Sequence, residues 1–159
     1  MAFEQNPYNL KLSFVAASDL STQQFRFVKN TGSVETGTPV VDAIGNTHWT
    51  RPIGILQNAP KVYASGKQEA EVTIAGITKV VVGDADGINP GDRIGAGEYG
   101  AAVSASSDDP DAAWAVGTAI TGGVAGDIIT VVINCTVPFK SAGVQGPQGA
   151  QGPQGAPGA

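Results

Sequence analysis

Charged residues are scarce in this sequence. Asp, Glu, Lys and Arg make up 14% of its 159 residues, against roughly 25% in an ordinary soluble domain. Acidic residues outnumber basic ones by 14 to 9, which gives a net charge of -5. A surface that binds nucleic acid needs clustered Lys and Arg to neutralise phosphates, and no basic run is present. The composition therefore argues against a nucleic-acid partner.

Cysteine and histidine each occur once, as Cys135 and His48. One cysteine cannot form an intrachain disulfide, and one histidine gives no zinc cluster. A dyad of Cys135 and His48 would need its nucleophile on a packed strand, which is a poor position for attack on a substrate. We therefore expect no catalytic residue, no metal site and no cofactor, and interpret the chain as a protein that is not an enzyme.

Long apolar runs are also missing. Nowhere do 18 apolar residues follow one another, which excludes the pattern of a membrane-spanning helix. The sequence begins MAFEQNPYNLKL, without the positively charged region and apolar block of a secretory signal peptide. We expect a protein that is made in a cytoplasm and has no membrane partner.

Helical periodicity is weak, whereas alternation typical of β-strands is frequent. Strands are expected at residues 8–15, 25–27, 69–74 and 127–137, each with apolar residues at every second position. In 8–15, for example, Leu10, Leu12 and Phe14 share one face with Tyr8. This pattern predicts one face in contact with water and one packed face.

The segment 127–137 differs because it is apolar on both faces in its first half, which is typical of a central strand. A helical turn fits only at 109–113. Clusters of turn-forming residues separate the expected strands; they lie at 30–32, 45–46, 64–66, 83–91, 104–111 and 121–126. Turns at such short intervals predict an all-β domain, a small antiparallel β-barrel or sandwich.

One acidic loop has the oxygen-rich composition of a calcium site: it contains Asp84, Asp86, Asn89 and Asp92. An EF-hand loop needs further acidic positions before its central glycine and a glutamate at its end. With Gly87 in the central position, neither requirement is met. We interpret the loop as two consecutive turns.

The larger aromatic residues Trp49, Tyr63 and Trp114 are interpreted as core or interface residues rather than as a platform for stacking sugars. The first nine residues form an expected N-terminal arm, 1–9, ahead of a β domain at 10–138. Its Phe3, Pro7 and Tyr8 are candidates for anchoring the arm on a partner, although such an arm also fits a frayed end.

The segment 139–159 is expected to form a collagen-like tail. Its glycines recur at every third position, at Gly143, Gly146, Gly149, Gly152, Gly155 and Gly158. In a triple helix every third residue faces the crowded axis, where only glycine fits, and prolines favour the required backbone dihedral angle. A flexible Gly/Pro/Gln linker is the alternative. Because the repeat is short, a triple helix would need a trimeric β domain that holds three tails together.

Five segments in order resemble a known family: PIGILQNAP at 52–60, EAEVTIAG at 69–76, INPGDRI at 88–94, AVGTA at 115–119 and GDIITV at 126–131. Together they resemble the small capsid decoration proteins of tailed bacteriophages. The likeness covers roughly residues 50 to 135. None of these motifs is catalytic.

The resemblance implies a β-barrel or β-tulip-like domain that binds the outer surface of the phage head as a homotrimer. There it would contact the major capsid protein and stabilise, or cement, the shell. It also implies synthesis in the cytoplasm of the bacterial host and a tail that points outward, where it would meet the host surface.

The alternative is a trimeric receptor-binding fibre or surface adhesin with a collagen stalk. The order of the segments separates the two functions, because a fibre usually places its stalk before its binding head. In this chain the β domain comes first.

Overall fold

The computed structural model describes residues 9–46, 50–60, 68–105, 114–136 and 139–140. Their elements are β1 (Leu10–Ala16), β2 (Phe27–Glu35), β3 (Thr38–Ala43), β4 (Gly54–Leu56), β5 (Glu69–Val81), β6 (Arg93–Ala96), the 3-10 turn η1 (Glu98–Gly100), β7 (Ala102–Ser104), β8 (Trp114–Ala119), β9 (Ile128–Asn134) and β10 (Phe139–Lys140). The prediction of an all-β chain is confirmed. Within the described part of the chain, no helix is long and apolar enough to cross a membrane.

Five strands close into a barrel. β1 pairs with β3, and the order then runs β3, β2, β4 and β5, which pairs with β1 again. The pairing of β1 with β3 is parallel, whereas the other pairs of the ring are antiparallel. Phe14 lies opposite Ala70 and Ala16 opposite Val41, and all four are buried in the core. The predicted small β-barrel is therefore confirmed.

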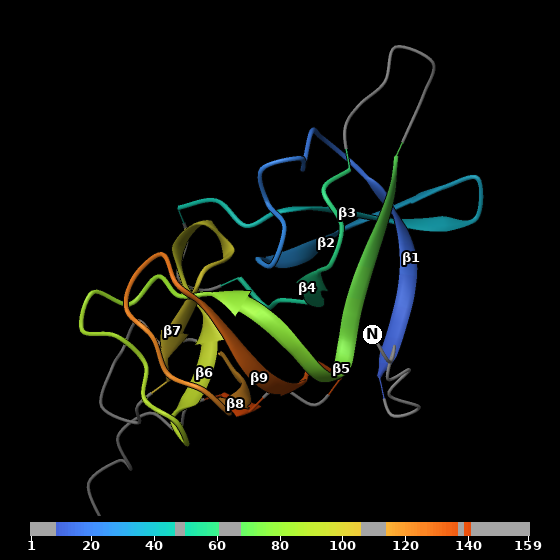
Figure 1. Cartoon of the computed structure of the whole chain (residues 1–159). Helices are drawn as coiled ribbons and strands as arrows, with labels where there is room; N and C mark the ends of the chain where they lie inside the picture. Colours follow the sequence, from blue (N-terminus) through green and yellow to red (C-terminus); the bar gives the residue numbers. More distant parts are fainter. Residues whose placement is uncertain (1–8, 47–49, 61–67, 106–113, 137–138, 141–159) are drawn as a thin grey trace, which may run out of the picture.

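The long strand β5 also belongs to a second group of strands. β5 continues past the barrel to Val81 and pairs there with β9, and β8, β6 and β7 follow. A parallel bridge from Val82 to Ala102 brings β7 back beside the end of β5. In Figure 1, β5 runs through the middle of the molecule, with β1 beside its first half and β9 beside its second.

The halves of β5 meet at Gly76, whose φ of +116° is unfavourable for residues with a side chain. A β-carbon at this position would also collide with Asn9. The strand predicted at 69–74 is thus confirmed, but it is about twice as long as expected. Gly76 permits the change of direction that lets one strand serve both halves.

Two local predictions are wrong. Phe25, expected in a strand, lies in a turn with a φ of 61°, and β2 begins only at Phe27. The expected turn at 30–32 lies inside β2 instead, where the register with β3 shifts between Asn30 and Val34. Asn30 Oδ1 accepts a hydrogen bond from the Gly32 amide, so the turn-forming residues produce an irregularity within the strand.

Candidate interaction surface

The pairing of β5 with β9 sorts their side chains onto two faces. Ile77 lies opposite Val132, and Val81 lies opposite Ile128. These residues share the outer face, because directly opposed residues point to the same side of a sheet. The residues that alternate with them, Val80 and Val131 among others, point inward and are buried.

The outer face carries several exposed apolar side chains that the described residues leave uncovered. Ile77, Ile128 and Val132 keep 46%, 53% and 42% of their surface exposed. Ile120, which follows β8 and donates its backbone N–H to the Thr130 carbonyl, is 45% exposed. We call the outer side of β9, β8, β6 and residues 77–81 of β5 the outer sheet face. The predicted central position of β9 is confirmed, since β5 and β8 flank it, but no described segment packs over its second apolar side.

A groove of about 390 Å³ opens on this face. Its lining comes from β6, β8 and β9, namely Arg93, Ala115, Val116, Gly117, Thr118, Val132, Ile133 and Asn134. Gly117 contributes no side chain, and a β-carbon there would collide with the Val132 carbonyl. A larger residue at this position would push β8 and β9 apart. The polar side chains of the lining are those of Arg93, Thr118 and Asn134.

β1 is packed only in part, which corrects the expectation for 8–15. Phe14 is buried, but Leu10 and Leu12 are 44% and 46% exposed. The reason is the extent of pairing: β3 contacts β1 only at Val15 and Ala16, whereas the earlier residues pair with β5 alone. Leu10 and Leu12 therefore lack the neighbour that alternation alone assumes.

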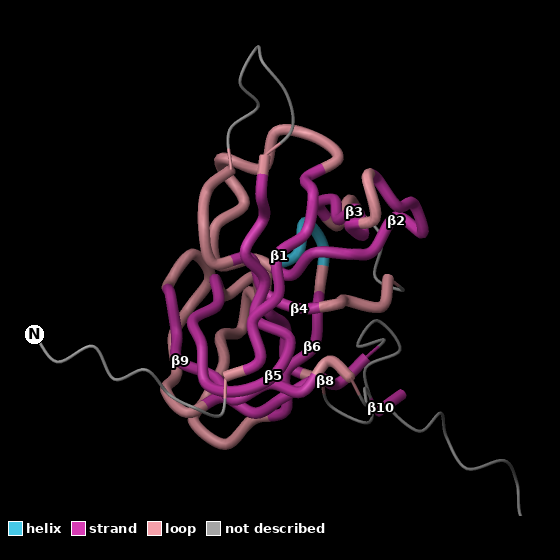
Figure 2. Tube along the Cα trace, turned by 90° about the vertical axis from the view of Figure 1, so that its right-hand side faces the viewer, coloured by secondary structure: helices cyan, strands magenta, loops and turns pink. Residues whose placement is uncertain are grey.

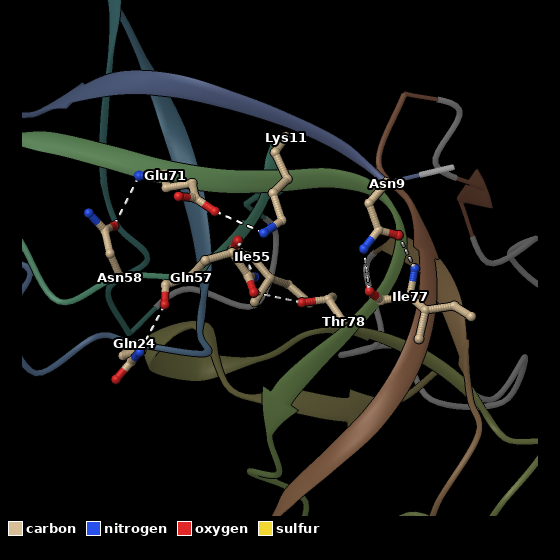
Figure 3. Close-up of polar contacts among 9 residues, drawn as sticks. All are labelled: Asn9, Lys11, Gln24, Ile55, Gln57, Asn58, Glu71, Ile77 and Thr78. Carbon is tan, nitrogen blue, oxygen red and sulfur yellow. Dashed lines mark hydrogen bonds and ion pairs between the residues drawn. The ribbon is translucent and has the colours of Figure 1, made fainter. Parts of the chain in front are cut away.

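Asn9 connects the start of β1 to the outer sheet face. Its Nδ2 donates to the Ile77 carbonyl at 3.0 Å, and its Oδ1 accepts from the Ile77 N–H at 2.8 Å (Figure 3). Sequence reasoning missed this role; the available signal was an asparagine placed just before a strand, where its side chain competes for backbone groups. The arm candidates Phe3, Pro7 and Tyr8 lie outside the described residues.

The segment 52–60, one of the five that resemble decoration proteins, carries polar side chains that bond within the fold. Gln57 donates to the Ile55 carbonyl and accepts from the Thr78 hydroxyl. Asn58 accepts from the Glu71 amide (Figure 3). These side chains tie β4 to β5.

The acidic loop behaves as two turns. Asp84 accepts from the amides of Asp86 and Ser104, and Asp92 accepts from the Asn89 amide. Because the carboxylates are used to hold backbone groups, the turn interpretation is confirmed. Among the described residues, no group of His, Cys, Asp and Glu is arranged to bind a metal ion.

Cys135 is buried just after β9. Burial raises the pKa of its thiol from 9.0 to about 12, and the charge of Arg51 offsets only part of that rise. The thiolate that a nucleophile needs is therefore scarce near neutral pH. Trp114 packs against the core as expected, with the Arg51 guanidinium 6.0 Å from its ring centroid.

The remaining predicted residues lie outside the described part of the chain. These are His48, Trp49 and Tyr63, the helical turn at 109–113 and the repeat glycines Gly143, Gly146, Gly149, Gly152, Gly155 and Gly158.

With this geometry described, the chain can be compared with known proteins. Its fold is similar to the crystal structure of the head fiber gp8.5 N base in bacteriophage phi29, with a TM-score of 0.54 and 20% sequence identity over 80% of this chain and 95% of that chain. The sequence matches no protein-family model and no curated protein. The likeness extends over nearly all of the phage domain, so the two share the β fold.

Proposed function

We propose that this chain is a structural protein of a bacteriophage virion, without enzymatic activity, that binds the outer surface of the head as a homotrimer. In this proposal the β domain contacts the major capsid protein and stabilises the shell. The collagen-like tail of each protomer points away from the head.

The observation that carries the proposal is the fold shared with a phage head fiber base, together with the order of the sequence motifs. The structural likeness spans 80% of the chain. The motifs at 52–60, 69–76, 88–94, 115–119 and 126–131 resemble decoration proteins independently of that likeness, since they are read from the sequence. Both point to a protein of the phage head.

The chemistry of the chain favours a structural role. The net charge of -5 suits a protein that must not bind the packaged genome. The thiol of Cys135 is buried and has a raised pKa, and the aspartates of the loop at 83–92 hold turn amides. These groups stabilise the fold and are not arranged to act on a substrate.

Binding to the assembled head would stabilise it by mass action. A protein that binds the intact shell and not its separated subunits shifts the equilibrium toward the shell. A trimer bridges several capsid subunits at once, so its individual contacts add up to a higher avidity.

The test uses heads of a phage that encodes this chain, prepared with the gene deleted. Purified protein is added to these heads, bound copies are counted after sedimentation, and the heads are heated to measure the temperature at which DNA is released. We expect saturable binding and a higher release temperature.

Two results would contradict the proposal. Heads that bind no added protein would exclude a capsid partner. Heads that bind it with no change in release temperature, but regain adsorption to cells, would replace cementing with the receptor-binding function of a fibre. Heads incubated with bovine serum albumin under the same conditions provide the control for nonspecific adsorption.

A further inference from the structure

We propose that the outer sheet face is the surface by which neighbouring protomers of the homotrimer meet, with apolar side chains of the adjacent copy seated in its groove. The inference rests on the trimer of the proposed function and assigns it a surface. Its occupant is a second copy of this chain.

The outer sheet face carries a group of exposed apolar side chains. Ile77, Ile120, Ile128 and Val132 lie on the same side of neighbouring strands and are all more than 40% exposed. Bulky apolar residues scattered singly over a surface need no explanation, whereas a contiguous apolar patch marks an interaction site. Leaving four such side chains in water forgoes the free energy that their burial would supply.

β10, the start of the collagen-like segment, lies near the same face. β10 pairs with the start of β8, with Phe139 opposite Ala115 and Lys140 opposite Trp114, and Figure 2 shows β10 next to β8. Ala115 also lines the groove. The described part of the C-terminal segment, at Lys140, therefore lies beside the outer sheet face.

Because a collagen-like repeat follows β10, the place of β10 indicates which surface of the domain faces the other protomers. Three chains must come together in a staggered bundle for Gly143 and the later glycines to face a common axis. The points at which the three tails leave their domains must then lie close to that axis. The surface next to those points is the outer sheet face, which is thereby turned toward the other copies.

The charge of the face also fits such a contact. On residues 77–81 of β5 and on β9, β8 and β6, its described residues include two cations, Lys79 and Arg93, and no carboxylate. The whole chain is acidic, with a net charge of -5. Two copies that meet in a threefold ring present different surfaces to each other, so a slightly basic apolar face meets an acidic neighbour without repulsion.

The size of the face fits an interface that works together with the tails. Four strands spaced about 4.8 Å apart and roughly six residues long cover about 400 Å². A stable interface takes about 800 Å² from each partner. The sheet face supplies about half of that, so the tails and adjoining turns must contribute the remainder. Face and tail are expected to stabilise the trimer jointly.

The test measures the solution mass of the full chain by light scattering over a range of concentrations. The wild-type mass should approach three times 16.0 kDa. The Val132→Asp substitution should raise the concentration at which the trimer dissociates by about 10- to 100-fold, because it puts a charge where an apolar side chain was buried. Val34→Asp is the matched control, since Val34 is 68% exposed on the β2–β3 hairpin and should leave the mass unchanged.

A second substitution guards against misfolding. Val132→Thr keeps the branched β-carbon that suits a strand and removes part of the apolar surface, so it should shift the dissociation concentration in the same direction by a smaller factor. Circular dichroism and urea unfolding of each variant show whether the domain is folded. If Val132→Asp does not fold, the dissociation concentration of Val132→Thr tests whether the outer sheet face forms the contact between protomers.

The outcomes separate this inference from the proposed function. A folded Val132→Asp variant that stays as trimeric as Val34→Asp would overturn the assignment of the surface and leave the trimer standing. A wild-type chain that is monomeric at every concentration would overturn the trimer itself. The binding of added protein to deleted heads tests the capsid partner separately from both.

Discussion

The carboxamide of Asn9 occupies the place of a strand residue opposite Ile77. It donates to the Ile77 carbonyl and accepts from the Ile77 N–H, which is the pair of hydrogen bonds that a backbone partner in an antiparallel sheet would make. The contact lies directly after Gly76, where β5 changes direction. The side chain of Asn9 thus holds the backbone of β5 at the position where the barrel ends and the second group of strands begins.

Replacement of Asn9 by alanine should lower the free energy of unfolding by about 1 to 2 kcal/mol, because two hydrogen bonds are lost. Urea unfolding followed by circular dichroism measures the change. Lys11→Ala is the control, since it removes only the exposed ion pair of Lys11 with Glu71 at 2.9 Å, which contributes about 0 to 1 kcal/mol. Equal effects of the two substitutions would contradict a special role for Asn9.

Gly100 should tolerate no side chain. Its φ is +72°, and a β-carbon there would collide with the Phe27 carbonyl. Gly100→Ala is therefore expected to cost at least about 2 kcal/mol of stability through strain alone. Gly45→Ala serves for comparison, because Gly45 has no atom within 4 Å of the added carbon and no positive φ.

The Gly45→Ala variant should be as stable as the wild type or slightly more so, by up to about 1 kcal/mol, because alanine restricts the unfolded chain. Thermal unfolding of both variants measures the difference. If Gly45→Ala loses as much stability as Gly100→Ala, the special constraint at Gly100 is contradicted.

The thiol of Cys135 should make the folded protein sensitive to alkaline pH. Its pKa is raised by burial to about 12 in the folded state, against 9.0 for an ordinary thiol. The unfolded chain therefore loses this proton first, and the associated stability is complete below pH 9 and falls as the pH rises toward 12. The free energy of unfolding of the wild type should decrease over this range more steeply than that of Cys135→Ala.

A thiol reagent gives an independent check of the same site. At pH 8 the folded protein should react slowly with Ellman's reagent and fully only after denaturation, since Cys135 is buried and protonated. Rapid reaction of the folded chain would mean that the thiol is accessible.

Alternation along the chain was sufficient to predict several strands. The apolar residues of 69–74 and 127–137 identified parts of β5 and β9, and the loop at 83–91 was correctly interpreted as turns. The prediction of a turn at 30–32 was wrong because the same residue types occur both in turns and in irregular strands. Asn30 and Gly32 are typical of a turn, but they produce an irregularity inside β2 because β3 continues to pair on both sides of it.

The candidate surface was harder to predict than the strands. Val131 and Val132 are adjacent and chemically identical, yet Val131 is buried and Val132 is 42% exposed. Alternation favours Val131 for the core, because Ile129 and Ile133 share its side of the strand whereas Thr130 and Asn134 share the side of Val132. It does not show which strands lie beside that outer side. These follow from pairing with Thr78 and Ile77, more than 50 residues earlier in the chain.

The sequence by itself determined the all-β class, the alternation that forms the strands and the Gly-X-Y repeat, because each depends on the order of neighbouring residues. Only the tertiary structure decided that β5 serves two groups of strands, that Asn9 binds Ile77, and that the described residues leave the outer sheet face uncovered. The physical reason is that burial depends on which distant strands pack against a residue. Alternation divides a strand into two faces, and the rest of the fold determines which of them is covered.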